Sequence, residues 1–132
     1  MDVIVDSCVW SLALRRKNPS TEIRDAVADL ISQSKICMLG PICQECLSGV
    51  NDADRYATLR DFFRNLPDAL LTTEDYELAA SFYNRCRSKG VQGSHIDFLI
   101  CAGANRLKCE LYTTDIDFDR YAPHIPIRRF KA

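Results

Sequence analysis

Apolar residues fall along the chain in short runs and at helical spacings, and these two patterns predict strands and helices in alternation. The first run, Val3 to Val5, is β-branched and typical of a buried strand. A second run, Ile36 to Leu39, stops at Gly40-Pro41, a pair that breaks a strand. Further strands are predicted at residues 70–71, 110–114 and 125–130.

Six helices are predicted between these strands, the first of them reaching Arg16. In the second helix Ile23, Val27 and Leu30 recur at intervals of four and three residues, so they form one apolar face. Cap residues and first-turn prolines mark where helices begin. The predicted starts are Ser7, Asn18-Pro19, Pro41, Asn51-Asp52, Thr72-Thr73 and Ser94.

This alternation requires crossover connections, which favour a mostly parallel sheet with helices on both faces. No repeat, linker or low-complexity stretch divides the 132 residues, so we expect one α/β domain over residues 1–132. Open parallel sheets hold their sites beyond the carboxyl ends of the strands. Functional residues are therefore expected at that edge.

Composition narrows the class of protein. Hydrophobic residues make up 47% and charged residues 27% of the chain, an ordinary globular balance. No apolar run approaches the roughly 18 residues that span a bilayer, and the acidic start lacks the basic region of a signal peptide. We therefore expect a cytoplasmic protein with no membrane segment.

Seven cysteines are present, an odd number that complete intramolecular pairing cannot accommodate. Most lie in apolar stretches, where a free thiol behaves as a small hydrophobe, as suits a reducing compartment. Cys43 and Cys46 form a C-x-x-C pair. A zinc site would need a second pair of ligands, and Cys101 and Cys109 are poorly spaced for one.

Charge is distributed unevenly, although the net charge is only −1. Basic clusters lie at Arg15–Lys17, at Arg85–Lys89 and across residues 120–131. They are either solvated helix ends or contacts for nucleic-acid phosphates. His95 is interpreted as a solvent-facing or capping residue and His124 as a loop residue. The larger aromatic residues, Trp10, Phe62, Phe63 and Phe82, are interpreted as core.

Carboxylates recur where the predicted strands end. Asp6 directly follows the first strand, and Asp115 and Asp117 follow the strand at residues 110–114. Glu45 lies early in the helix after the second strand, and Asp97 lies in the first turn of the sixth helix. Segments distant in sequence would thus bring acids to one edge of one sheet.

Most of these acids also have an ordinary structural explanation. Asp6 could cap the first helix, Ser94 with Asp97 fits a capping box, and Asp115 with Asp117 could form a turn. Together they are harder to explain in that way, because gathered carboxylates repel one another unless they are paired, protonated or bound to a cation.

A hard divalent cation resolves this conflict, since Mg²⁺ takes oxygen ligands and keeps waters that leave room for a phosphate. Such an ion can activate water and stabilise the oxygens of an in-line displacement. No Gly-rich phosphate loop, G-x-S-x-G or dinucleotide-binding motif is present, and no histidine is an obvious base.

Four stretches in order along the chain resemble the motifs of one family, the PIN domains, and within it the VapC-type toxins of toxin–antitoxin pairs. The most specific are Asp97–Ala104, similar to the family's D-x-x-I-A-x-x-A helix, and Leu111–Phe118, similar to its T-x-D-x-D-F strand end. The other two are Val3–Ser7 and Pro41–Gly49. Cysteines replace commoner neighbours, as at Cys101, and leave the acids unchanged.

The resemblance implies a PIN-like three-layer α/β/α sandwich and a metal-dependent endoribonuclease. The implied partners are an RNA substrate, a small VapB-type antitoxin that often inserts a basic side chain into the acidic site, and a second copy in a homodimer. The implied Mg²⁺ or Mn²⁺ ligands are Asp6, Asp97 and Asp115, with Glu45 positioning the water. Further candidates are Asp117 as a fifth acid and Ser7 and Thr113 as supporting hydroxyls.

Three alternatives stay open on the sequence. A PIN nuclease of RNA processing or decay without a toxin role would carry the same motifs. A receiver-type phosphoacceptor domain is also a parallel α/β fold with an acidic pocket, but it would want a lysine after a late strand, where this chain has Asp115. A binding module that has lost nuclease activity is disfavoured because every acid is present.

Overall fold

The fold is built on a four-stranded parallel sheet, which the computed structural model describes together with the rest of residues 1–132. The strand order is β3-β2-β1-β4, and every neighbouring pair is parallel. The strands are β1 (Val3–Val5), β2 (Ile36–Leu39), β3 (Asp68–Ala69) and β4 (Glu110–Tyr112). The expected α/β class with a parallel central sheet is confirmed.

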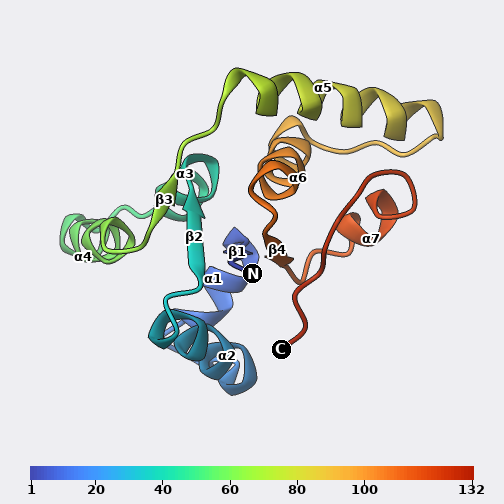
Figure 1. Ribbon diagram of the computed structural model, residues 1–132. Coiled ribbons are helices and arrows are strands. Elements are labelled where there is room, and N and C mark those ends of the chain that lie inside the picture. Colours follow the sequence, from blue (N-terminus) through green and yellow to red (C-terminus); the bar gives the residue numbers. More distant parts are fainter.

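Seven helices connect and flank the strands. Because the chain steps in one direction from β1 through β2 to β3 and then returns to β4, right-handed crossovers place the connecting helices on opposite faces. Figure 1 shows α2 and α5 on opposite sides of the sheet. The helices are α1 (Ser7–Ala13), α2 (Thr21–Ser32), α3 (Gly40–Leu47), α4 (Ala53–Arg64), α5 (Thr73–Ser88), α6 (His95–Leu107) and α7 (Asp117–Tyr121).

The core lies around β1 and α6. Every residue of β1 is at most 1% exposed, and α6 is buried continuously from Phe98 to Ala104. Gly103 lets α6 approach its neighbours closely, since a Cβ there would lie 2.9 Å from Cδ2 of Leu71. Trp10, Phe63 and Phe82 are buried as expected, whereas Phe62 is half-buried at the edge of the core.

Helices α5 and α6 are joined by an ion pair between a buried aspartate and a partly exposed arginine. Asp75 is 1% exposed and accepts hydrogen bonds from Nε and Nη2 of Arg106, at 2.7 and 2.9 Å. The same carboxylate accepts a bond from the backbone N–H of Thr72 at 2.8 Å, which completes the capping box of α5. Asp75 therefore fixes both the start of α5 and its docking on α6.

Three details of the predicted elements are wrong. Leu70 and Leu71 do not form a strand, because β2 pairs with Asp68 and Ala69 just before them and Leu70 is 82% exposed. The stretch 125–130 contains Pro126 and makes only an isolated bridge between Arg129 and Leu111. The first helix ends at Ala13, not at Arg16.

The length of the helices and the state of the cysteines also bear on the class of protein. No helix combines the length and apolar character that crossing a membrane requires. All seven cysteines are unpaired.

Candidate active site

Asp6 is the buried anchor of the site, 6% exposed at the end of β1. It is the N-cap of α1, and its Oδ1 accepts a hydrogen bond from the backbone N–H of Ser7 at 2.8 Å. Its Oδ2 accepts a bond from the Thr113 hydroxyl at 2.8 Å, and the Cys8 thiol lies 3.5 Å from the same oxygen. The Asp6 side chain can therefore cap α1 with one oxygen and take part in the site with the other.

Thr113 connects the ends of the neighbouring strands β1 and β4. Its hydroxyl donates to Asp6 after β1 and accepts from the backbone N–H of Asp115 after β4, at 3.1 Å. Oδ1 of Asp115 in turn accepts from the backbone N–H of Asp117 at 2.9 Å, which turns the chain into α7. The reversal of strand order between β1 and β4 is the place where parallel sheets bind ligands.

Asp97 reaches this edge from the first turn of α6. One carboxylate oxygen from each of Asp97, Asp115 and Asp117 lies within 4.8 Å of the other two. Oδ2 of Asp97 accepts a hydrogen bond of 2.7 Å from the Tyr121 hydroxyl. Ser94 caps α6 by accepting from the backbone N–H of Asp97, so the Asp97 carboxylate itself faces the acids and Tyr121.

The acids repel one another. Burial raises the pKa of Asp97 above its ordinary value, and the charges of Asp115 and Asp6 raise it further, although hydrogen bonds from Tyr121 and Ser94 act in the opposite direction. The charged form of Asp97 is therefore costly in the protein alone, and a cation among these oxygens would relieve that cost.

Glu45 lies at the margin of this cluster. It is exposed on α3, and its Oε2 accepts a hydrogen bond of 3.1 Å from the Ser7 hydroxyl. Ser7 thereby links Glu45 to Asp6, to which its backbone N–H is bonded. A cavity of about 680 Å³ opens beside Ser7 and Glu45 and extends along α4 to Phe62 and Arg55.

The predicted site residues therefore fall into one connected network. Asp97, Asp115 and Asp117 form the tightest group of oxygens, Asp6 joins them through Thr113, and Glu45 joins Asp6 through Ser7. Oδ1 of Asp117 also lies 3.6 Å from Nη1 of Arg120. Part of the Asp117 charge is therefore balanced by a cation outside the three acids.

One residue that touches the site, Tyr121, and one that packs against it, Gly93, were not expected from the sequence. Tyr121 is fully buried on α7, and Gly93 lies directly against it: a Cβ on Gly93 would lie 2.5 Å from the Tyr121 hydroxyl and 2.7 Å from Cζ of Phe98. A five-residue helix rich in charge gives little periodicity, so α7 could not be predicted. Because α7 is not predicted, the sequence alone does not place Tyr121 beside Asp97.

Among the thiols only that of Cys8 contacts the acidic network, at 3.5 Å from both Oδ2 of Asp6 and the Thr113 hydroxyl. Burial, with the nearby charges of Cys43 and Glu45, raises the pKa of Cys46 to about 12. Burial and Asp68 raise the pKa of Cys43 as well. The C-x-x-C pair therefore lacks the low-pKa thiolate of a redox motif.

The structure defines a class, the parallel α/β proteins with an acidic site at the strand-order reversal, and comparison with known proteins identifies the family. The family model described as "PIN domain" matches residues 3–123. The chain therefore belongs to the PIN domain family, as its four motifs predicted. This membership removes the receiver-type alternative.

Named relatives refine the comparison. The chain is 29% identical over 121 residues to Ribonuclease VapC11 of Mycobacterium tuberculosis, and 89% of each chain is covered. Among solved structures, the fold is similar to VapBC-1 from nontypeable Haemophilus influenzae, with a TM-score of 0.76, 13% identity and coverage of 98% and 97%. DNA-bound VapBC from Salmonella typhimurium gives a TM-score of 0.75 at 19% identity, covering 98% of each chain.

Proposed function

We propose that this protein is a metal-dependent endoribonuclease and the toxin component of a VapBC-type pair. The observation that carries the proposal is the convergence of Asp97, Asp115 and Asp117, with oxygens within 4.8 Å, beside the buried Asp6 in a PIN fold. The ribonuclease relative and the VapBC structures support the toxin role.

The donor set fits a hard divalent cation, Mg²⁺ or Mn²⁺. The converging ligand atoms are carboxylate oxygens without a thiol or imidazole among them, as such ions prefer. We assign the ligands to Asp6, Asp97 and Asp115, with Asp117 as a further candidate. Bound there, the ion would lower the pKa of a water and offset charge on a scissile phosphate.

The protein's own residues prepare this chemistry. Thr113 and Ser7 hold both oxygens of Asp6 in place, so that the carboxylate cannot rotate away from the site. Glu45, held by the Ser7 hydroxyl and exposed to solvent, is placed to orient a water and to accept its proton. The products of this hydrolysis would be two RNA fragments, one ending in a phosphate and the other in a hydroxyl.

The cavity beside Glu45 is where we place the antitoxin. Apolar and aromatic side chains, including Trp10, Leu59 and Phe62, line it, and Glu45 is the one acid in its lining, together with Arg16 and Arg55. A partner segment with an apolar face would complement the apolar lining, and a basic side chain on that segment would complement Glu45. A homodimer and a cytoplasmic location complete the proposal, the latter because seven unpaired thiols suit a reducing compartment.

The test is cleavage of an end-labelled RNA pool by purified protein with Mg²⁺ or Mn²⁺, with EDTA and an Asp97→Asn variant alongside. We expect cleavage that needs the metal and falls by at least about a hundredfold in the variant. Asp25→Asn is the matched control, because Asp25 is exposed on α2 and makes no side-chain hydrogen bond. Metal-independent cleavage, or cleavage that survives in Asp97→Asn, would contradict the proposal.

The toxin role needs a separate test. Expression of the wild-type chain in a bacterial host should arrest growth, and Asp97→Asn should not. Co-expression of the small neighbouring gene should restore growth, and the purified pair should elute together. Cleavage in vitro without growth arrest would favour the alternative of an RNA-processing nuclease. Light scattering on the purified chain reports the dimer.

A further inference from the structure

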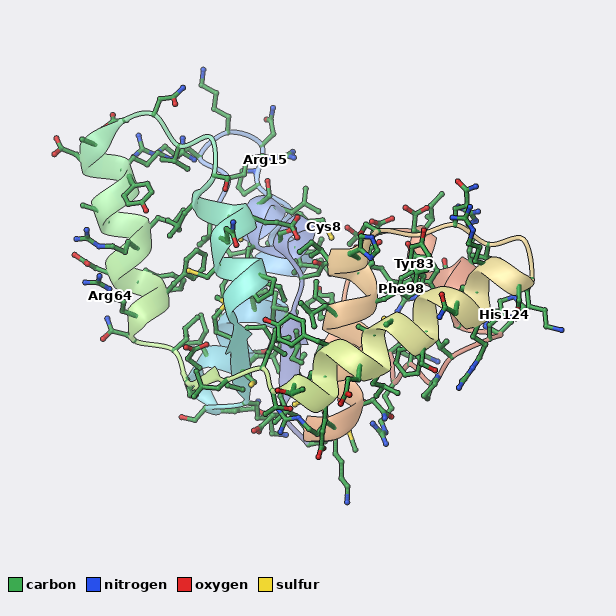
Figure 2. All side chains as sticks on the ribbon, turned by 90° about the horizontal axis from the view of Figure 1, so that it is seen from above. Cys8, Arg15, Arg64, Tyr83, Phe98 and His124 are labelled. Carbon is green, nitrogen blue, oxygen red and sulfur yellow. The ribbon has the colours of Figure 1, made fainter.

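An exposed imidazole lies flat on a tyrosine ring at the start of the helix that carries Asp97. His95, the first residue of α6, stacks on Tyr83 of α5 with ring centroids 4.9 Å apart and planes 14° from parallel. Tyr83 is half-buried and meets Phe98 edge-on, whereas His95 is exposed. Figure 2 shows Tyr83 next to Phe98 at the N-terminal end of α6. The imidazole thus has one face on the tyrosine and the other open to solvent.

The stack is anchored by a cation. Nη1 of Arg87 donates a hydrogen bond of 2.9 Å to the Tyr83 hydroxyl, and its guanidinium carbon lies 5.9 Å from the centre of that ring. None of the four ion pairs involves Arg85 or Arg87, whereas Arg120 and Arg129 are paired with aspartates. The end of α5 therefore carries positive charge that no carboxylate neutralises.

The stack lies at the same end of α6 as Asp97. His95 and Asp97 belong to the same first turn, about 3 Å apart along the helix axis but about 200° apart around it, so their side chains leave different sides of the helix. A strand whose phosphate lies at the acids and which continues around the start of α6 would bring a neighbouring base to the imidazole, rather than the base of the same nucleotide. The interpretation of His95 as solvent-facing is correct, since the residue is exposed.

We propose that His95, supported by Tyr83, binds one unpaired nucleobase of the substrate by stacking, and that Arg87 binds a neighbouring phosphate. Single-stranded RNA is commonly held in this way, by flat side chains for its bases and by arginines for its backbone. The inference rests on the proposed function, since it takes RNA as the substrate. Under this proposal the His95–Tyr83 stack binds unpaired RNA, and the acids carry out the cleavage.

The presence of only two histidines permits a direct test by NMR of the imidazole C–H signals. Adenosine 5′-monophosphate and ribose 5-phosphate are added in turn to metal-free protein, and a His95→Ala variant identifies the His95 signal. We expect the nucleotide to move the His95 signal upfield through the ring current of its base, and the sugar phosphate to move it much less. His124, which Figure 2 shows apart from Tyr83, is the internal control. Equal shifts with both compounds, or none, would overturn the proposal.

Binding of fluorescent single-stranded RNA, compared with an abasic strand of the same length, measures the strength of the platform. His95→Ala should weaken binding of the normal strand about tenfold and leave the abasic strand almost unchanged. Arg87→Gln should weaken both strands alike. His95→Ala is expected to fold normally, because His95 is exposed and alanine favours helix.

These readouts separate the two proposals. Base-dependent binding that His95→Ala abolishes, in a protein that cleaves no RNA, would support the platform and contradict the nuclease. Metal-dependent cleavage by a protein whose preference for the normal strand survives in His95→Ala would do the reverse.

Discussion

The Tyr121 hydroxyl donates a 2.7 Å hydrogen bond to Oδ2 of Asp97, and this bond joins α7 to the first turn of α6. The tyrosine ring is fully buried against Phe98 and Phe118, at centroid distances of 4.8 and 5.4 Å. Its hydroxyl therefore has a fixed position, and it holds one oxygen of Asp97 without neutralising the carboxylate. Tyr121 is in this sense a positioning residue for the acids.

Replacing Tyr121 by phenylalanine should weaken metal binding without disrupting the core. The ring packing remains, but the Asp97 carboxylate loses the donor that orients it. We expect the affinity for Mn²⁺, measured by calorimetry on the protein without RNA, to fall about tenfold, at the low end of the range for groups that orient metal ligands. Tyr112→Phe makes the same change in another buried tyrosine, one whose hydroxyl makes no hydrogen bond, and should bind Mn²⁺ normally. Equal affinities in the two variants would contradict this role.

Gly93 should tolerate no side chain while Tyr121 is present. A Cβ there would lie 2.5 Å from the Tyr121 hydroxyl and 2.7 Å from Phe98, so Gly93→Ala must displace one of the two rings. We expect the free energy of unfolding to fall by about 1–3 kcal/mol. Gly40→Ala, where nothing lies within 4 Å of the new Cβ, is the control and should be nearly neutral.

The cause of that loss can be checked by a double mutant. Because Tyr121→Phe removes the atom nearest to the new Cβ, Gly93→Ala should cost less stability in that background than in the wild type. Additive losses in urea titrations of the four proteins would show that the contact with the hydroxyl is not the source of the strain.

The acids could be found from the sequence because each lies in or next to a segment with a strong pattern. The β-branched run before Asp6 and the capped apolar helix that carries Asp97 needed no knowledge of tertiary contacts. The hydrogen bond of Tyr121 could not be found in this way, because it depends on where α7 folds back, and α7 is too short for periodicity. The strand at 68–69 was missed for a similar reason: two residues pair with β2 by position, while the apolar Leu70 beside them is exposed.

The ion pair between Asp75 and Arg106 should make a measurable contribution to stability. Burial opposes the charged form of Asp75, but the hydrogen bonds from Arg106 and the Thr72 backbone outweigh it and lower the pKa of this carboxyl. Asp75→Asn would remove the buried carboxylate that accepts from Arg106 and Thr72, and we expect a loss of about 1–3 kcal/mol in unfolding free energy, because Arg106 itself stays partly solvated. Asp61→Asn tests an exposed pair, with Arg60, and should cost less than about 1 kcal/mol. A similar cost for both variants would mean that burial adds nothing.

Asp97→Asn should stabilise the metal-free protein at neutral pH while removing its response to metal. The pKa of Asp97 is raised by burial and by Asp115 and Asp6, so the folded protein binds this proton more tightly than the unfolded chain does. Wild-type stability must therefore fall as pH rises through the ordinary pKa of aspartate, about 4, to the higher folded value. Thermal melts in EDTA should give the variant a higher Tm at pH 7 and little advantage below pH 4. Added Mn²⁺ should raise the Tm of the wild type and not that of the variant. A variant less stable than the wild type at pH 7 in EDTA would show instead that the Asp97 charge is balanced within the protein.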